Sequence, residues 1–206
     1  MCYTDLLVKP RSLDEAVYMM KLLKKMGYRT VGVDVGIGSE TIRSLREKGE
    51  SMGLRVLEVA TLDTRDEREA KKAISELRGG RIVIGKARSP SVLRFFSRDS
   101  RVHVVEPVPR LTKLFDRNQS ALMKQGGSML GLNLSMLLRD PSLLPWFDRM
   151  ISFALRYGVD LVLYSGASSW NMLWHPRIVR HLLSSMGYSG RVGLMALSPE
   201  INALLR

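Results

Sequence analysis

The stretch RIVIGKARSPSVLRFFSRDSRVHVVE, residues 81–106, carries the pattern that decides the fold. It opens with a β-branched run, continues through Ser89-Pro90 into a helix-period run, and closes with a second β-branched run. Serine followed by proline is a typical helix start, because proline fits the first turn of a helix. The stretch therefore predicts a strand over Arg81–Ile84, a helix that begins at Ser89, and a strand over Val102–Val105.

The same alternation of strand and helix patterns continues toward both ends of the chain. The eight predicted strands are Tyr3–Val8, Thr30–Val35, Arg55–Ala60, Arg81–Ile84, Val102–Val105, Met129–Asn133, Leu161–Tyr164 and Arg191–Met195. Eight strand–helix repeats favour an α/β fold of the TIM-barrel-like (β/α)8 type, and an open, doubly wound sheet is the second choice. No linker rich in proline, serine or glycine divides the chain, so residues 1–206 are predicted to form a single domain.

Capping residues mark the ends of the predicted helices. Ser12 and Glu15 have the spacing of a capping box, and the helix that they open is predicted to stop at Gly27. The other predicted helices begin at Ser39, Asp66 and Ser89 or cover Leu111–Gln125, Ser142–Tyr157, Pro176–Met186 and Pro199–Leu205.

The chain is strongly basic. Of its 206 residues 45% are hydrophobic, and 32 lysines and arginines face 20 aspartates and glutamates, a net charge of +12. The apolar content excludes a wholly disordered chain, and the charge points to a polyanion, either nucleic acid or an anionic membrane surface. Residues 64–125 hold most of the surplus, with 15 basic and 7 acidic side chains. The alternative explanation of this surplus is solubility or thermal adaptation, with no polyanionic partner.

Few residues are available for a metal or redox site. The one cysteine, Cys2, excludes an internal disulfide, and the three histidines, His103, His175 and His181, are few for a zinc or di-iron hydrolase. His103 lies inside a predicted strand, where a buried or half-buried structural histidine is expected. No run of 18 apolar residues occurs, and Asp5 interrupts the region where a signal peptide has its apolar core. We therefore expect a cytoplasmic protein without a membrane partner.

Basic residues follow several of the predicted strands. In a barrel the strand ends and the loops after them build the functional face. Lysines and arginines beside a helix start, such as the one at Ser89, are typical of phosphate-binding sites. Aromatic residues suited to base stacking are sparse, so contact with the backbone of folded RNA is favoured over base readout. The predicted RNA-binding residues are Lys86, Arg88, Arg110, Lys113, Arg117 and Arg177.

Short segments in order along the chain resemble the archaeal and eukaryotic ribonuclease P protein component three family, the thirty-kilodalton subunit type. The resemblance rests on the opening Tyr3-Thr4-Asp5-Leu6, on Gly32-Val33-Asp34, and on the stretch from Val104 to Gln119. It continues through Leu161–Ala167, with its Ser-Gly-Ala segment, to Met172–Arg180. Each motif is short, and their order and spacing over most of the chain carry the resemblance.

The resemblance implies a function and a set of partners. It implies a TIM-barrel-like fold related in shape to metal-dependent phosphoesterases but lacking their metal ligands. It also implies a protein subunit of ribonuclease P, the ribonucleoprotein endonuclease that removes 5′ leaders from precursor tRNA. The implied partners are the catalytic RNA, a second small protein subunit and, indirectly, precursor tRNA. Catalysis then belongs to the RNA, which holds the Mg²⁺, so no catalytic residue, metal site or cofactor is expected on this chain.

Two other functions remain open from the residues alone. The first is a stand-alone barrel enzyme acting on a phosphorylated small molecule, with Asp34 and Asp63 as acid and base and Lys86 and Arg88 as a phosphate clamp. The second is a scaffold that mainly binds a protein partner through an apolar patch. For the RNA-binding subunit, we expect Arg88→Ala and Lys113→Ala to lower holoenzyme activity without unfolding the protein.

Overall fold

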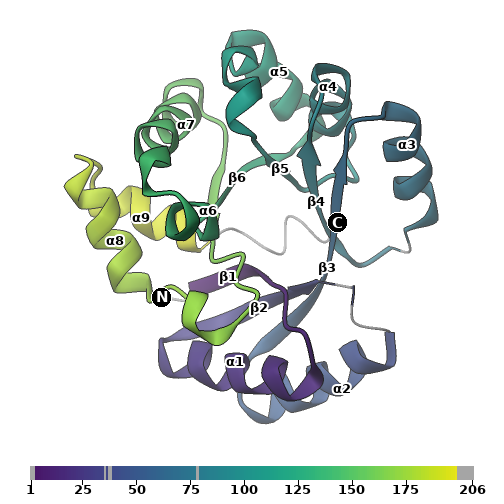
Figure 1. The fold of residues 1–206 in the computed structure, drawn as a ribbon, viewed down its shortest axis with the longest axis vertical. Helices are drawn as coiled ribbons and strands as arrows, with labels where there is room; N and C mark the ends of the chain where they lie inside the picture. The colour runs from purple at the N-terminus through teal and green to yellow at the C-terminus, as the bar shows by residue number, and fades with distance from the viewer. Residues whose placement is uncertain (1–2, 35, 37–38, 78, 199–206) are drawn as a thin grey trace. The chain divides into compact units, whose positions relative to one another are not determined.

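The computed structural model describes residues 3–34, 36, 39–77 and 79–198 of the chain (Figure 1). The strands are β1 (Tyr3–Val8), β2 (Tyr28–Asp34), β3 (Arg55–Thr64), β4 (Ile82–Ala87), β5 (Val104–Glu106), β6 (Met129–Asn133) and β7 (Leu161–Tyr164). The α-helices are α1 (Leu13–Lys25), α2 (Ser39–Ser51), α3 (Glu67–Glu76), α4 (Pro90–Arg98), α5 (Arg117–Gly126), α6 (Ser135–Arg139), α7 (Leu144–Tyr157), α8 (Pro176–Ser185) and α9 (Gly190–Leu197). Short 3₁₀ helices are η1 (Pro109–Leu114), η2 (Pro141–Leu143) and η3 (Trp170–Met172).

The strands form a parallel sheet whose order is the order of the chain, from β1 to β7. The segment after β7 returns to the first strand. Val8 and Ala167 form a parallel bridge, and the N–H of Lys9 donates to the carbonyl of Ala167 at 2.7 Å. Sequential parallel strands, helices between them, and a last segment paired with the first strand make this an α/β fold of the TIM-barrel-like class, as the sequence predicts.

The predicted eighth strand, Arg191–Met195, is wrong, because these residues lie in α9. Gly193, Ala196 and Leu197 are buried while Met195 is exposed, which is the spacing of one helical face. Val192 is the one β-branched residue of α9, and leucine, methionine and alanine favour a helix. The described residues therefore contain seven strands, not eight.

The predicted helix over Leu111–Gln125 is also wrong at its start. It is divided into η1 and α5, because Asp116 caps a new helix by accepting the N–H of Gln119 at 2.9 Å. The other helix starts fall within one or two residues of their predictions. The N-cap residue of the short α6 is Leu134, which has no capping side chain, and this explains why no capping signal in the sequence marks the helix. The predicted helix over Pro199–Leu205 lies outside the described residues.

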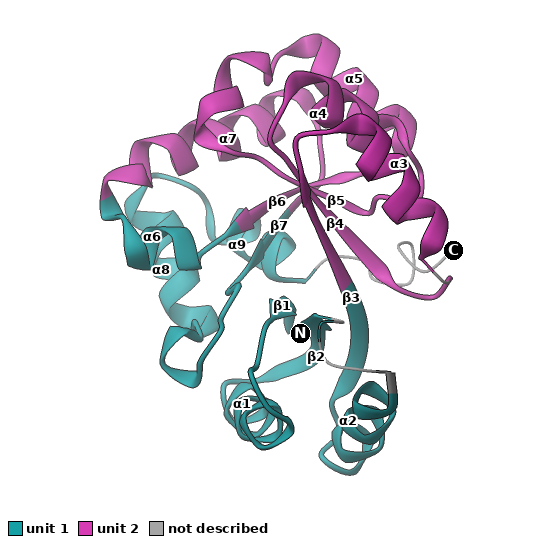
Figure 2. Cartoon of the chain, turned by 45° about the vertical axis from the view of Figure 1, so that its right-hand side comes forward, with its two compact units in different colours: residues 1–59, 133–141, 162–200 teal, residues 60–132, 142–161, 201–206 magenta. Residues whose placement is uncertain are grey.

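Two compact units can be distinguished within the chain, and Figure 2 colours them separately. Unit 1 consists of residues 1–59, 133–141 and 162–200. Unit 2 consists of residues 60–132, 142–161 and 201–206.

Unit 1 has a core between α1 and the first two strands. Helix α1 buries Ala16, Met19, Met20 and Leu23, the spacing of an amphipathic helix. Its start is fixed by Ser12, whose hydroxyl accepts the N–H of Glu15 at 3.2 Å. The Glu15 carboxylate accepts the N–H of Arg11 instead of that of Ser12, so one half of the predicted capping box forms.

Unit 2 contains α3, α4 and α5, which lie side by side in both ribbon views (Figures 1 and 2). Helix α4 begins at Ser89, whose hydroxyl accepts the N–H of Val92 at 3.4 Å, and it buries Val92, Leu93, Phe95 and Phe96. This apolar face leaves the arginines of α4 on the exposed side. No helix among the described residues has the length and apolar content needed to cross a lipid bilayer.

Candidate functional site

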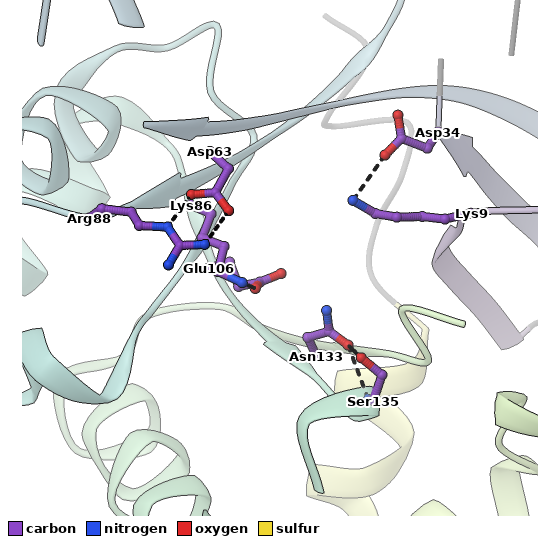
Figure 3. Close-up of polar contacts among 8 residues, drawn as sticks. All are labelled: Lys9, Asp34, Asp63, Lys86, Arg88, Glu106, Asn133 and Ser135. Carbon is purple, nitrogen blue, oxygen red and sulfur yellow. Dashed lines mark hydrogen bonds and ion pairs between the residues drawn. The ribbon is translucent and has the colours of Figure 1, made fainter. Parts of the chain in front are cut away.

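Two ion pairs lie at the ends of β3, β4 and β5 in unit 2 (Figure 3). Lys86 and Glu106 occupy paired positions on β4 and β5, and the Lys86 Nζ lies 3.1 Å from the Glu106 Oε1. Arg88 donates from Nε and from a terminal nitrogen to the two oxygens of Asp63, at 2.5 and 2.6 Å. The hydrogen bonds and charge of Asp63 raise the pKa of the Arg88 guanidinium, and the charge of Glu106 adds to this effect.

The two ion pairs reduce the ability of Lys86 and Arg88 to bind a phosphate group. The structure brings the two predicted RNA-binding residues together, but it gives each of them a carboxylate partner. The Glu106 side chain is 3% exposed and that of Lys86 is 23% exposed, so this pair is largely shielded from solvent. Two cations and two carboxylates compensate one another, which makes this cluster a poor clamp for a phosphate.

Three other predicted RNA-binding residues present uncompensated charge. Arg110 and Lys113 lie on η1, and Arg117 is the first residue of α5. All three are exposed, and within the described part of the chain none forms an ion pair. Phosphate groups could therefore approach them without displacing a carboxylate.

The η1 segment that carries Arg110 and Lys113 is fixed by neighbouring side chains. The hydroxyl of Thr112 donates to the carbonyl of Pro109 at 2.5 Å, and the indole N–H of Trp146 donates to the Thr112 oxygen at 2.8 Å. Phe115, directly after η1, packs edge-on against Phe153 of α7 with ring centroids 5.4 Å apart. These contacts hold the two cations on an ordered part of unit 2.

Unit 1 has polar residues at the ends of its own strands (Figure 3). The Lys9 Nζ lies 3.0 Å from an Asp34 oxygen, and the Asn133 side-chain oxygen accepts the N–H of Ser135 at 3.0 Å. The sixth predicted RNA-binding residue, Arg177, lies exposed on α8 in this unit, whereas the other five belong to unit 2. The proposed acid and base of the enzyme alternative, Asp34 and Asp63, are thus each paired with a basic side chain of their own unit.

Unit 1 also contains a buried carboxylate that is not among the site residues predicted from the sequence. Asp5 of β1 is 1% exposed, and its Oδ1 accepts the N–H groups of Ser165 at 3.0 Å and of Leu7 at 3.4 Å. Burial raises the pKa of Asp5 to about 6, although the hydrogen bonds from Ser165 and Leu7 favour the charged form. An aspartate inside a run of apolar strand residues is the sequence signal for such a group.

The Ser-Gly-Ala segment singled out in the sequence has a structural role beside Asp5. The N–H of Gly166 donates to the carbonyl of Leu7 at 3.0 Å, and that of Ala167 donates to the Ser165 hydroxyl at 3.2 Å. Gly166 has a φ of +59°, and a Cβ at this position would overlap the Asn133 side chain. The segment therefore pairs the end of β7 with β1, which explains its glycine.

Two histidines serve as hydrogen-bond acceptors for the backbone. His103 is half-buried, as expected, and its Nδ1 accepts the N–H of Val83 at 3.0 Å. His175 caps α8, since its Nδ1 accepts the N–H of Arg177 at 3.1 Å. Among the described residues no three histidine, cysteine, aspartate or glutamate side chains come together as a group that could hold a metal ion.

Comparison with known proteins gives a likeness in structure. No family model matches the sequence, and no curated protein matches it. A chain in the cryo-EM structure of archaeal ribonuclease P with mature tRNA matches with a TM-score of 0.80. The two share 15% sequence identity over 96% of this chain and 89% of that one. The likeness is one of fold.

A second solved structure aligns less closely. It is the crystal structure of an uncharacterized protein, with a TM-score of 0.59 and 10% identity over 98% of this chain and 74% of that one. At these identities both matches concern the fold, and the match to the ribonuclease P chain is closer and covers more of its partner.

Proposed function

We propose that this chain is a protein subunit of ribonuclease P that binds and stabilises the catalytic RNA during removal of 5′ leaders from precursor tRNA. The observation that carries the proposal is the structural match to the archaeal ribonuclease P chain, which extends over nearly the whole of both chains. The short sequence segments that resemble this kind of subunit lead to the same expectation, although no family model matches the sequence.

The charge of the chain fits this role. RNA is a polyanion, and the chain has a net charge of +12. On the exposed side of η1 and at the start of α5, Arg110, Lys113 and Arg117 offer cations that no carboxylate of the described chain neutralises. Arg177 on α8 of unit 1 is a further exposed cation predicted to contact RNA.

The proposed mechanism is electrostatic. Clustered RNA phosphates repel one another, and lysine and arginine side chains relieve this repulsion. The folded RNA then keeps its Mg²⁺ sites at a lower Mg²⁺ concentration. In this mechanism the protein supplies no nucleophile or general base, and a second small protein subunit completes the complex.

Reconstitution tests the proposal. Precursor tRNA cleavage is measured with archaeal ribonuclease P RNA and its other protein subunits, with and without the full-length chain, over a series of Mg²⁺ concentrations. We expect the chain to lower the Mg²⁺ concentration needed for half-maximal cleavage. An unchanged Mg²⁺ dependence, together with equal binding to ribonuclease P RNA and to an unrelated RNA of the same length, would contradict the proposal.

A further inference from the structure

Unit 2 has a second basic surface, formed by α3, α4 and α5. Two adjacent hollows of about 480 and 660 Å³ lie on it and share Glu67 and Ser91 in their linings. We call them together the α3–α5 groove. The cations that line the groove are Arg65, Arg68, Lys71, Arg94 and Arg98.

The carboxylates of the groove are already engaged. The Asp66 carboxylate caps α3 and accepts the N–H of Arg68 at 2.6 Å. The Glu67 carboxylate lies 2.7 Å from the Nζ of Lys71. The lining therefore has five cations against two carboxylates, and it keeps a surplus of positive charge.

Four arginines of the groove keep an uncompensated charge. Arg65 and Arg68 are exposed on the α3 side, and Arg94 and Arg98 are exposed one turn apart on α4. Across residues 3–198, as far as the structure describes them, none of the four forms an ion pair. Four guanidinium groups of like sign on one surface repel one another, and an anionic ligand would relieve this repulsion.

The two sides of the groove are joined by hydrogen bonds. The Ser89 hydroxyl donates to the carbonyl of Arg65 at 2.8 Å, and the N–H of Arg88 donates to the carbonyl of Thr64 at 2.9 Å. The start of α4 is thereby held against the segment before α3. The arginines thus project from fixed backbone, which lowers the entropy cost of binding an extended anion.

The lining selects the class of ligand. It contains no aromatic side chain on which a base could stack, whereas Ser91 and Asn118 add hydrogen-bonding groups suited to phosphate and ribose oxygens. Its apolar residues are Ala121 and Leu122, a small area for insertion into a lipid surface. We infer that the α3–α5 groove binds the phosphodiester backbone of folded RNA. This inference rests on the proposed function and assigns RNA contacts to arginines other than the six residues predicted from the sequence.

A charge-reversal pair tests the groove. In the full-length chain, Arg94→Glu and Arg98→Glu are combined and compared with a matched control, Arg149→Glu with Arg156→Glu, on the exposed side of α7 in the same unit. Both variants change the net charge equally, so long-range electrostatics is matched between them. We expect the groove variant to bind ribonuclease P RNA at least tenfold more weakly than the control. The slope of log affinity against log salt should fall by about 2, because each lost phosphate contact lowers it by roughly 1.

Crosslinking places the RNA independently of affinity. With Cys2 replaced by serine, Ser91→Cys carries a photoactivatable crosslinker in the groove, and Ser152→Cys carries it on α7 as the control. We expect RNA adducts from position 91 and few from position 152. Circular dichroism and thermal unfolding of every variant show whether it is folded.

The outcomes separate the groove from the function. Equal affinities and salt slopes for the groove and control variants, with no adduct at position 91, would overturn the inference while wild-type binding still supports the proposed function. Failure of the wild-type chain to bind ribonuclease P RNA would remove both. Binding to phosphatidylserine vesicles that is lost in the groove variant, with RNA binding unchanged, would also overturn the inference.

Discussion

The Oδ1 atom of Asp5 accepts the backbone N–H of Ser165 at 3.0 Å, across 160 residues of sequence. Asp5 lies on β1 and Ser165 directly follows β7, so a buried carboxylate links the first strand to the end of the last. The other oxygen, Oδ2, is buried and has no hydrogen-bond partner among the residues that the structure describes. The link is therefore made by a group whose charged form is poorly solvated.

The stability of the protein is expected to depend on the ionisation of Asp5. Its pKa is about 6 in the folded protein against 3.8 as the ordinary value, so the folded state binds the proton more tightly than the unfolded state. The stabilising contribution is present in full below pH 4 and is lost as the pH rises through 6. From this group we expect the free energy of unfolding to fall by roughly 3 kcal/mol over that range.

Asp5→Asn tests this dependence by chemical denaturation at pH 4 to 8. The variant keeps an oxygen for the N–H of Ser165 but carries no charge. Its free energy of unfolding should therefore fall much less between pH 4 and 7 than that of the wild type. Asp14→Asn on the exposed side of α1 serves as the control for removal of a carboxylate. Identical pH profiles for the wild type and Asp5→Asn would rule out the predicted role of the buried carboxylate.

Gly166→Ala is expected to destabilise the protein by about 2 kcal/mol or more. Gly166 has a positive φ, and a Cβ there would also overlap the Asn133 side chain. Gly187→Ala is the matched control, because Gly187 also has a positive φ but a Cβ would meet open space. We expect the control to cost about 1 kcal/mol by urea denaturation. Equal costs for the two variants would show that the contact with Asn133 is unimportant.

Lys86→Met is expected to destabilise the protein by about 3 kcal/mol, because it removes the cation that pairs with the buried Glu106 carboxylate. The double variant Lys86→Met with Glu106→Gln should recover part of the loss, since no charge then remains buried. A double-mutant cycle of unfolding free energies measures this coupling. Additive effects of the two substitutions would indicate that Arg88, and not Lys86, compensates Glu106.

Removal of the three cations of η1 and the start of α5 is expected to weaken RNA binding and to lower its dependence on salt. The combined variant Arg110→Ala, Lys113→Ala and Arg117→Ala should lower the slope of log affinity against log salt by about 2 to 3, because each neutralised phosphate contributes roughly 0.9. Arg88→Ala should have a smaller effect than the single variant Lys113→Ala, because Asp63 already compensates the charge of Arg88. Filter binding with ribonuclease P RNA over a salt series measures both slopes. A larger loss of RNA affinity for Arg88→Ala than for Lys113→Ala would contradict the prediction that Lys113, and not the ion-paired Arg88, contacts the RNA.

Much of the fold could be predicted from local sequence because its signals are local. Ser12, Asp66 and Ser89 each cap the helix that their position predicts, since a cap depends on residues two or three apart in the chain. Short apolar runs, most of them with β-branched residues, located the seven strands. The sequence predicts a strand over Arg191–Met195, but the structure has a helix there. The buried residues of α9 repeat every three to four positions, and this spacing becomes evident only once the helix is packed.

The sequence by itself determined the alternation of strands and helices, the surplus of positive charge in residues 64–125, and the shortage of histidine and cysteine for a metal site. The tertiary structure decided which of the cations are available to a ligand. Arg88 and Lys113 are both basic residues after a strand, but Asp63 reaches Arg88 from another strand of the sheet, and no described carboxylate pairs with Lys113. Ion pairing depends on distances between residues far apart in the chain, and folding alone sets those distances.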